Sequence, residues 1–362
     1  MTKALAGVFD APGKIGLRSF PLPRLLEGEI LVRVRMCTIC GSDLHTYTGR
    51  RSVSSPMILG HEIIGVVERV VGEVRAFGPE RPVVRVGDRV VWSLCHSCGT
   101  CDRCSKGIPQ KCHHLMKFGH HPIESSHPLM GGLSTYCHLP AGTAIFQVPA
   151  EIPDEVACPA SCATATVVAS VTRAGVRKGE SVLVQGMGML GVTAVGLLRQ
   201  EGLERVIACD TDPTRLEQAK RFGATSIIRA DQPVRSFRDE VLALTDGHGM
   251  DVILEMSGCP SAIESGMELL GTGGRYVWVG GVFPTVPGSI VPETVIRKHA
   301  AIFGVHNYDP HSLWTALVFL GTSGARLPFG ELVSARFPLE QISEAFRYAL
   351  EHKPFRVAVT MP

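Results

Sequence analysis

Three features are missing from this 362-residue sequence. It has no run of about 18 apolar residues, so it offers no candidate transmembrane helix. Its net charge is only +2, which gives no electrostatic reason to expect nucleic acid or a membrane surface as a partner. The segment Met1–Lys14 is partly apolar, but Asp10 interrupts it and no small-residue cleavage pattern follows. We therefore expect a cytoplasmic protein without a secretory signal.

The composition is typical of a soluble globular protein. Apolar residues make up 45% and charged residues 19%, which excludes a disordered chain because enough apolar surface is available for burial. A length of 362 residues predicts two domains. We find no internal repeat and no low-complexity segment.

Cysteine is unusually frequent, with 12 residues, and five of them fall in one short stretch. Cys98, Cys101, Cys104 and Cys112 have the spacing C-x2-C-x2-C-x7-C. Short C-x2-C spacings let neighbouring thiolates reach one zinc ion, and four protein ligands leave no open position. The loop therefore predicts a structural zinc site. Cys95 lies outside this pattern and fits an ordinary buried thiol better than a fifth ligand.

The pattern of apolar residues changes along the chain. Residues 29–36, 63–71 and 88–92 read as β-strands, and 95–130 lacks regular periodicity. Strands and helices then alternate, with strands predicted at 181–185, 206–210, 252–255 and 276–279 and helices at 191–199 and 213–222. This alternation is typical of a doubly wound parallel sheet. The chain ends on a predicted strand at 355–360.

Gly186, Gly188 and Gly191 form a G-x-G-x-x-G motif between a predicted strand and helix. In this context the glycines allow a tight turn, approach of the backbone to a pyrophosphate, and close helix–strand packing. Asp210 ends the next strand, 24 residues after Gly186. Its carboxylate would bind a ribose 2′-hydroxyl and repel a 2′-phosphate, so we expect NAD rather than NADP. Asp212 fits better as the cap of the following helix.

A second metal site is suggested by residues that are weak evidence singly. Cys40 stands in CGSDLH and His61 in GHE, twenty residues further on. Both precede the cysteine loop and the nucleotide motif, and Cys158 or Cys162 could supply a third ligand. Three protein ligands leave a fourth position for water or substrate, which is the arrangement of a catalytic zinc.

Taken together, these motifs resemble the zinc-dependent medium-chain alcohol dehydrogenases. The resemblance rests on CGSDLH (40–45), GHE (60–62), the four-cysteine loop, C-x3-C (158–162), GMGMLG (186–191) and Asp210. It implies an α/β fold with a GroES-like, mostly-β catalytic domain at 1–162 and 304–362 and a doubly wound Rossmann NAD-binding domain at 163–303. It also implies a homo-oligomer, either a dimer or a tetramer.

The resemblance assigns the catalytic zinc ligands as Cys40, His61 and Cys162. Many bacterial members have a glutamate at the third position, whereas this chain has the cysteine spacing of the classical enzymes, with Cys158 as the competing ligand. Glu62 resembles a carboxylate that can approach the metal. Asp43 resembles the carboxylate that orients the zinc-binding histidine, which fixes its tautomer.

Other roles also follow from the resemblance alone. Ser42 resembles a hydroxyl that relays the alcohol proton through the cofactor ribose to His45. Thr166 resembles a residue near the nicotinamide carboxamide, and Leu190 an apolar residue behind the ring. Arg356 resembles an arginine that contacts the pyrophosphate.

The implied activity is hydride transfer between an alcohol, or its aldehyde or ketone, and NAD, with one catalytic and one structural Zn²⁺. Two alternatives stay open. An NADPH-dependent aldehyde reductase of the same fold would carry a small or basic residue at position 210. A non-catalytic zinc- or nucleotide-binding module should have lost its ligands.

The substrate is suggested only by charge. Arg50 and Arg51 follow the 40–45 segment, and Arg51 takes the place of a common apolar lining residue of the family. Lys117, His120 and His121 could face the same cleft. A desolvated arginine there needs an anion as its partner, and the segment also resembles dehydrogenases associated with phosphonate metabolism. We therefore expect an anionic alcohol such as a hydroxyalkylphosphonate, unless Arg50 and Arg51 simply point into water.

Overall fold

The computed structural model describes residues 3–123, 126–282 and 290–362. The chain divides into two compact units. The first contains the described residues up to Ala165 together with Asn307–Gly321 and Phe329–Pro362, and the second contains Thr166–His306 and Thr322–Pro328. These divisions lie three residues beyond those expected at 162 and 303, and the 322–328 segment joins the second unit instead of the first.

The placement of that segment has a simple packing reason. A side-chain carbon at Gly196, on helix α5 (Met189–Gln200), would lie 2.7 Å from Leu327 Cδ1. Glycine at this position lets Leu327 lie directly on the helix. The short 3₁₀ turn Ser323–Arg326 also contacts α5.

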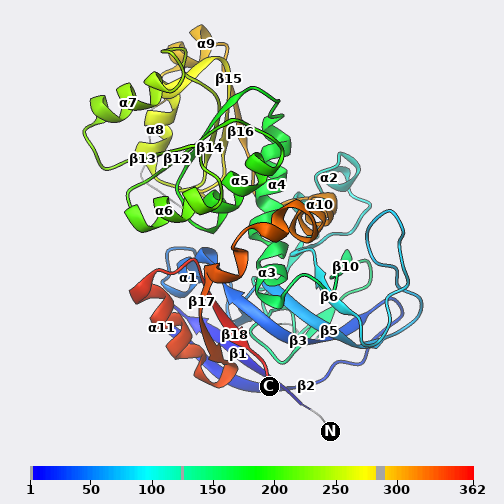
Figure 1. Ribbon diagram of the computed structural model, residues 1–362. Helices are drawn as coiled ribbons and strands as arrows, with labels where there is room; N and C mark the ends of the chain where they lie inside the picture. The colour runs from blue at the N-terminus through cyan, green and yellow to red at the C-terminus, as the bar shows by residue number, and fades with distance from the viewer. Residues whose placement is uncertain (1–2, 124–125, 283–289) are drawn as a thin grey trace. The chain divides into compact units, whose positions relative to one another are not determined.

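The first unit is built mainly from antiparallel strands (Figure 1). One sheet has the order β2-β1-β4, from Lys14–Pro21, Lys3–Ala11 and Met57–Ile58. The larger sheet has the order β10-β6-β5-β3-β18-β17, from Ile145–Gln147, Arg89–Trp92, Glu62–Val70, Ile30–Ile39, Arg356–Thr360 and Val333–Pro338. Strand β9 (Tyr136–Leu139) also pairs with β3, and β7 (Cys95–His96) pairs with β8 (Met116–Lys117). The helices of this unit include α1 (Gly41–Tyr47), α2 (Asp102–Ser105), α3 (Asp154–Ala157), α10 (Pro310–Gly321) and α11 (Ile342–His352).

Strand β3 lies at the centre of the first unit. Along its middle, Val32 and Val34 are buried while Arg33 and Arg35 are exposed, as the period of two predicts. Its last four residues, Met36–Ile39, are all buried. The chain therefore leaves β3 inside the protein, directly before Cys40.

The second unit contains a six-stranded parallel sheet of order β13-β12-β11-β14-β15-β16. The strands are Ser226–Arg229, Arg205–Asp210, Ser181–Gln185, Met250–Glu255, Leu270–Trp278 and Ala301–Gly304. The connections are helical: α5, α6 (Pro213–Arg221), α7 (Val234–Ala243), α8 (Pro260–Leu269) and α9 (Pro292–Arg297), with α4 (Ala163–Ala174) leading into the sheet. The strand order reverses between β11 and β14, so this is the doubly wound sheet expected from the sequence. The predicted α/β fold class is confirmed.

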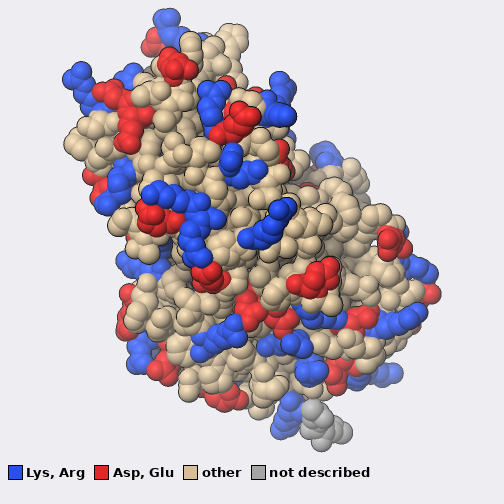
Figure 2. All heavy atoms as spheres, viewed as in Figure 1, with Lys and Arg blue, Asp and Glu red and all other residues tan. Residues whose placement is uncertain are grey.

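Two further observations concern the surface and the helices. Lys and Arg groups are interspersed with Asp and Glu groups over the face shown in Figure 2.

No single helix in the described residues is long and apolar enough to cross a membrane, although the bent pair Asp154–Ser161 and Ala163–Ala174 passes this test by length and composition alone.

Candidate active site

Three strand ends bring distant residues together beside Cys40. Strand β5 is antiparallel to β3, with Thr38 opposite Glu62, so the start of β5 lies beside the end of β3. Strand β18 is antiparallel to β3 on its other side, with Val357 opposite Ile39. Residues that precede or begin these two strands therefore meet the residue that follows β3.

Cys40, His61 and Cys162 form one cluster at this point. Their potential ligand atoms all lie within 4.8 Å of one another. Cys40 and His61 are buried and Cys162 is half-buried. Cys158 belongs to none of the candidate metal groups of the described residues, because its buried thiol lies 3.1 Å from the Glu62 carbonyl and 3.5 Å from that of Met36.

His61 is oriented by two neighbours on α1. Its Nδ1 lies 3.2 Å from Asp43 Oδ1, and its Nε2 lies 3.2 Å from Ser42 Oγ. Asp43 is fully buried and also accepts hydrogen bonds from the Cys40 and Gly60 N–H groups. Burial lowers the pKa of His61, but Asp43 and Cys40 outweigh it and raise this pKa to about 10. A metal bound at Nε2 of His61 would displace the proton that this nitrogen carries in the charged imidazolium.

A buried ion pair between Arg356 and Glu62 adjoins the cluster, and the sequence does not predict that these two residues are partners. Arg356 Nε and Nη2 donate to the two carboxylate oxygens of Glu62 at 2.6 and 2.7 Å. Thr38 Oγ1 donates to the same carboxylate at 2.6 Å, and Arg356 Nη2 lies 3.5 Å from Cys40 Sγ. Burial raises the pKa of Glu62 to about 7, although Arg356 opposes this shift.

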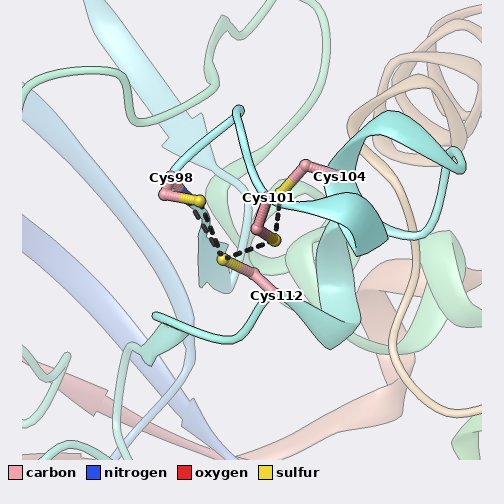
Figure 3. A group of neighbouring side chains, drawn as sticks. All are labelled: Cys98, Cys101, Cys104 and Cys112. Carbon is pink, nitrogen blue, oxygen red and sulfur yellow. Dashed lines mark hydrogen bonds between the residues drawn. The ribbon is translucent and has the colours of Figure 1, made fainter.

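The four predicted cysteines of the loop also converge (Figure 3). Cys101 Sγ lies 3.5 Å from Cys104 Sγ and 3.8 Å from Cys112 Sγ, and Cys112 Sγ lies 3.4 Å from Cys98 Sγ. Four sulfurs at about 2.3 Å from a tetrahedral zinc would be about 3.8 Å apart, so the group fits this metal. Backbone N–H groups of Thr100 and Cys101 lower the pKa of Cys98 to about 5, which favours the thiolate. Cys95 is buried on β7 and outside the group.

The remaining cationic and imidazole side chains differ in exposure. Arg50 is exposed, whereas Arg51 and Lys117 are half-buried. His120 lies against the cluster, with its ring centroid 5.0 Å from that of His61. His121 is half-buried as well. His45 on α1 is half-buried, and burial together with the charge of Arg50 lowers its pKa.

In the second unit the glycine motif lies at the reversal of strand order. Gly186 follows β11 with φ +91°, and a side chain there would meet Ser257, which follows β14, at 2.7 Å. A side chain at Gly191 would collide with the Gly186 carbonyl oxygen. Gly188 caps the N-terminus of α5, which leaves backbone N–H groups free of a side-chain cap.

Asp210 lies at the glycine turn, where its carboxylate accepts hydrogen bonds from Met187 N at 2.6 Å and Asp212 N at 2.9 Å. Asp212 caps α6 through Thr214 N, as its position in the sequence suggests. Leu190 is half-buried in the first turn of α5, and Thr166 is buried in α4.

Comparison with known proteins agrees with both units. Residues 26–150 match the family model of the alcohol dehydrogenase GroES-like domain, and residues 190–321 match that of the zinc-binding dehydrogenases. An L-threonine 3-dehydrogenase of Anaeromyxobacter is 32% identical over 353 residues, which cover 95% of each chain.

Solved structures give the same answer. An alcohol dehydrogenase of Thermotoga maritima is 28% identical, with a TM-score of 0.93 over the whole of both chains. An alcohol dehydrogenase of Escherichia coli CFT073, solved with NADH, is 26% identical with a TM-score of 0.85, over 99% of this chain and 100% of that one. This chain is thus a dehydrogenase, and it belongs to the zinc-dependent medium-chain alcohol dehydrogenase family.

Proposed function

We propose that this chain oxidises an alcohol with NAD, using a zinc ion held by Cys40, His61 and Cys162. The observation that carries the proposal is the convergence of these ligand atoms within 4.8 Å, although Cys162 is more than 100 positions from Cys40 and His61 in the sequence. Two thiolates and an imidazole form a catalytic zinc set with one open position. A zinc ion in such a set makes a bound hydroxyl group more acidic.

The neighbouring side chains support this role for the cluster. Asp43 accepts from His61 Nδ1, which leaves Nε2 as the nitrogen facing the sulfurs. Ser42 and His45 lie one turn apart on α1 and are assigned to carry the alcohol proton away. Burial and the charge of Arg50 lower the pKa of His45, which favours the neutral imidazole, the form that can accept a proton.

The second proposed zinc ion is structural and is held by Cys98, Cys101, Cys104 and Cys112. All four positions of a tetrahedral ion would be filled by protein sulfur, so this ion has no site for substrate. Its role is to fix a segment whose regular structure is limited to the short elements β7, α2, the 3₁₀ turn Pro109–Lys111 and β8.

The cofactor is proposed to be NAD, bound at the Gly186–Gly191 turn with Asp210 on the ribose. Two of the Arg356 nitrogens are engaged by Glu62, and Nη1 donates to the Phe355 carbonyl. Its contact to the pyrophosphate therefore stays a prediction, as do the nicotinamide contacts of Thr166 and Leu190.

The two alternatives have less support. An NADPH-dependent reductase is disfavoured by the carboxylate of Asp210 at the glycine turn. A non-catalytic module is disfavoured because the three-residue cluster, Ser42 and Asp43 all lie together. A cytoplasmic location and a homo-oligomeric state also stay predictions.

The proposal is tested by following NADH formation with zinc-replete protein and a panel of alcohols. The panel includes L-threonine because a relative of this chain is named L-threonine 3-dehydrogenase. Turnover is expected with NAD and is expected to disappear when a chelator removes the catalytic metal. Ser42→Ala should lower kcat about 100-fold, the effect of losing a proton-transfer group. Thr48→Ala, which removes an exposed hydroxyl just beyond α1, is the matched control and should change kcat less than about twofold. Absence of turnover with every alcohol and both nucleotides would refute the proposal.

A further inference from the structure

Two cationic side chains approach the proposed catalytic centre from separate segments. Arg51 follows α1, and its N–H donates to the His45 carbonyl at 3.1 Å. Lys117 ends β8, opposite Cys95 of β7. Both are half-buried, and burial lowers the pKa of each. Besides burial, the charges that affect the pKa of Lys117 include those of Cys95, Arg51 and Cys162.

The turn that follows Lys117 is fixed against the proposed zinc ligand His61. Phe118 is fully buried, and its N–H donates to the Leu94 carbonyl at 3.0 Å. Gly119 has φ +74°, and a side chain there would collide with the Gly60 carbonyl oxygen. His120 then packs its ring on that of His61. Lys117 is therefore held beside the centre by the backbone rather than carried on a loose surface loop.

The donors of the two cations are largely unused within the protein. Among the described residues, Lys117 Nζ makes one hydrogen bond, to Asn307 Oδ1 at 3.2 Å, which is a neutral partner. An ammonium has three donors, so two remain. The Arg51 guanidinium makes no hydrogen bond or ion pair with the described part of the chain. Partly buried cations without an anionic partner are costly.

In the described part of the chain no carboxylate forms an ion pair with Arg51 or Lys117, although the charge of Asp43 acts on Arg51. Asp43 is hydrogen-bonded to His61 and to two backbone N–H groups, and Glu62 is held in a bidentate pair with Arg356. The charges of two thiolates cancel that of Zn²⁺. A surplus of positive charge is therefore left at Arg51 and Lys117.

We infer that Arg51 and Lys117 form a subsite for an anionic group of the substrate, so that the preferred substrates are small alcohols bearing a phosphonate, phosphate or carboxylate. This inference rests on the proposed function, because it places the anion beside the proposed zinc. It moves the expected anion contact from the pair Arg50 and Arg51 to Arg51 and Lys117, since Arg50 is exposed. An alcohol with a nearby ammonium group would be repelled by the same two cations.

Binding is tested first without turnover. Ethylphosphonate and propionate, which have no hydroxyl to oxidise, are titrated calorimetrically into zinc-replete protein. Arg51→Ala and Lys117→Met should each weaken binding of at least one of these anions by about 10- to 100-fold, the effect of losing a charged hydrogen-bonded contact. Arg50→Ala is the matched control and should bind as the unmodified protein does. The stronger of the two ligands identifies whether the group is a phosphonate or a carboxylate.

Kinetics then separate this inference from the proposed function. With 2-hydroxyethylphosphonate or 3-hydroxybutyrate as substrate, the Arg51 and Lys117 variants should raise KM about 10-fold or more, with little change for a neutral alcohol of similar size. The subsite is overturned if the variants raise KM equally for anionic and neutral alcohols. It is also overturned if neither variant weakens the binding of ethylphosphonate or propionate. Both results would leave the proposed dehydrogenase activity intact. If the unmodified protein oxidises none of the alcohols but still binds the anions through Arg51 and Lys117, the proposed function is refuted and the subsite is supported.

Discussion

At the scale of single residues, two aspartates two positions apart have different surroundings. Asp212 accepts from Thr214 N and caps the N-terminus of α6, whereas the Asp210 carboxylate accepts from Met187 N in the glycine turn. The sequence predicts this division because Asp212 directly precedes Pro213, and proline is frequent at the first position of a helix. It does not predict that Arg215 Nη1 would come within 3.9 Å of a side chain placed at Gly188.

This arrangement predicts the outcome of changing the cofactor residue. Asp210→Gly removes the carboxylate and leaves Arg215 near the turn, so the preference for NAD over NADP should fall by about 10- to 100-fold. Glu217→Gln is the control, because it removes a negative charge from α6 that pairs with Lys220 and not with Arg215. The ratio of kcat/KM for the two nucleotides measures the effect. If Asp210→Gly leaves that ratio unchanged, Asp210 does not set the cofactor preference.

At the scale of elements, the pattern of apolar residues predicts strands well where it is regular. Strand β11 has the bounds predicted at 181–185, but β15 begins at Leu270, six residues before the predicted 276. The early part of β15 reads LGTGG, which has too few side chains to show a period of two. Of this early part only Leu270 pairs with β14, opposite Met250, and the regular pairing begins at Arg275 opposite Val252, one residue before the predicted start.

The same limit applies to contacts between elements. The metal-ligand candidates are recognisable because C-x2-C and C-x3-C spacings carry information within a few residues. Glu62 and Arg356 are 294 positions apart, and only the pairing of β5 and β18 with β3 brings them together. No local pattern in the sequence predicts such an ion pair.

The start of β3 provides a test of a contact between elements. Glu29 is buried and accepts from Leu26 N at 2.8 Å and from His138 Nε2, on β9, at 3.0 Å. Burial raises the pKa of Glu29, but these hydrogen bonds and the charge of His138 lower it overall. Glu29→Gln should reduce the free energy of unfolding at pH 7 by about 1–3 kcal/mol.

The pH dependence of that effect has a defined sign. Because the folded pKa of Glu29 lies below its unfolded value of about 4.3, its stabilisation is present above that pH and is lost as the pH falls through the folded pKa. In denaturant titrations, the difference in the free energy of unfolding between the unmodified protein and Glu29→Gln should therefore become smaller below about pH 4. The exposed neighbour Glu27, changed to Gln, should show no such difference. A pH-independent gap would mean that the ionised carboxylate is not the source.

At the scale of the whole molecule, the account depends on two separate zinc sites in one chain. The first has two cysteines, one histidine and an open position, and the second has four cysteines and none. The family is established by the comparisons, but the metal content and the role of each ligand are predictions about this chain. Loss of one site should leave the other intact, because their ligands share no residue.

The most direct measurement is therefore the zinc content of the purified protein and three variants, read together with activity and thermal stability. The unmodified protein and Cys158→Ser should contain two zinc ions per chain, because Cys158 lies outside both groups. Cys162→Ser should contain one, lose turnover and keep its melting temperature within a few degrees. Cys98→Ser should also contain one and melt at a clearly lower temperature. One zinc or none in the unmodified protein, or full zinc and turnover in Cys162→Ser, would contradict the account.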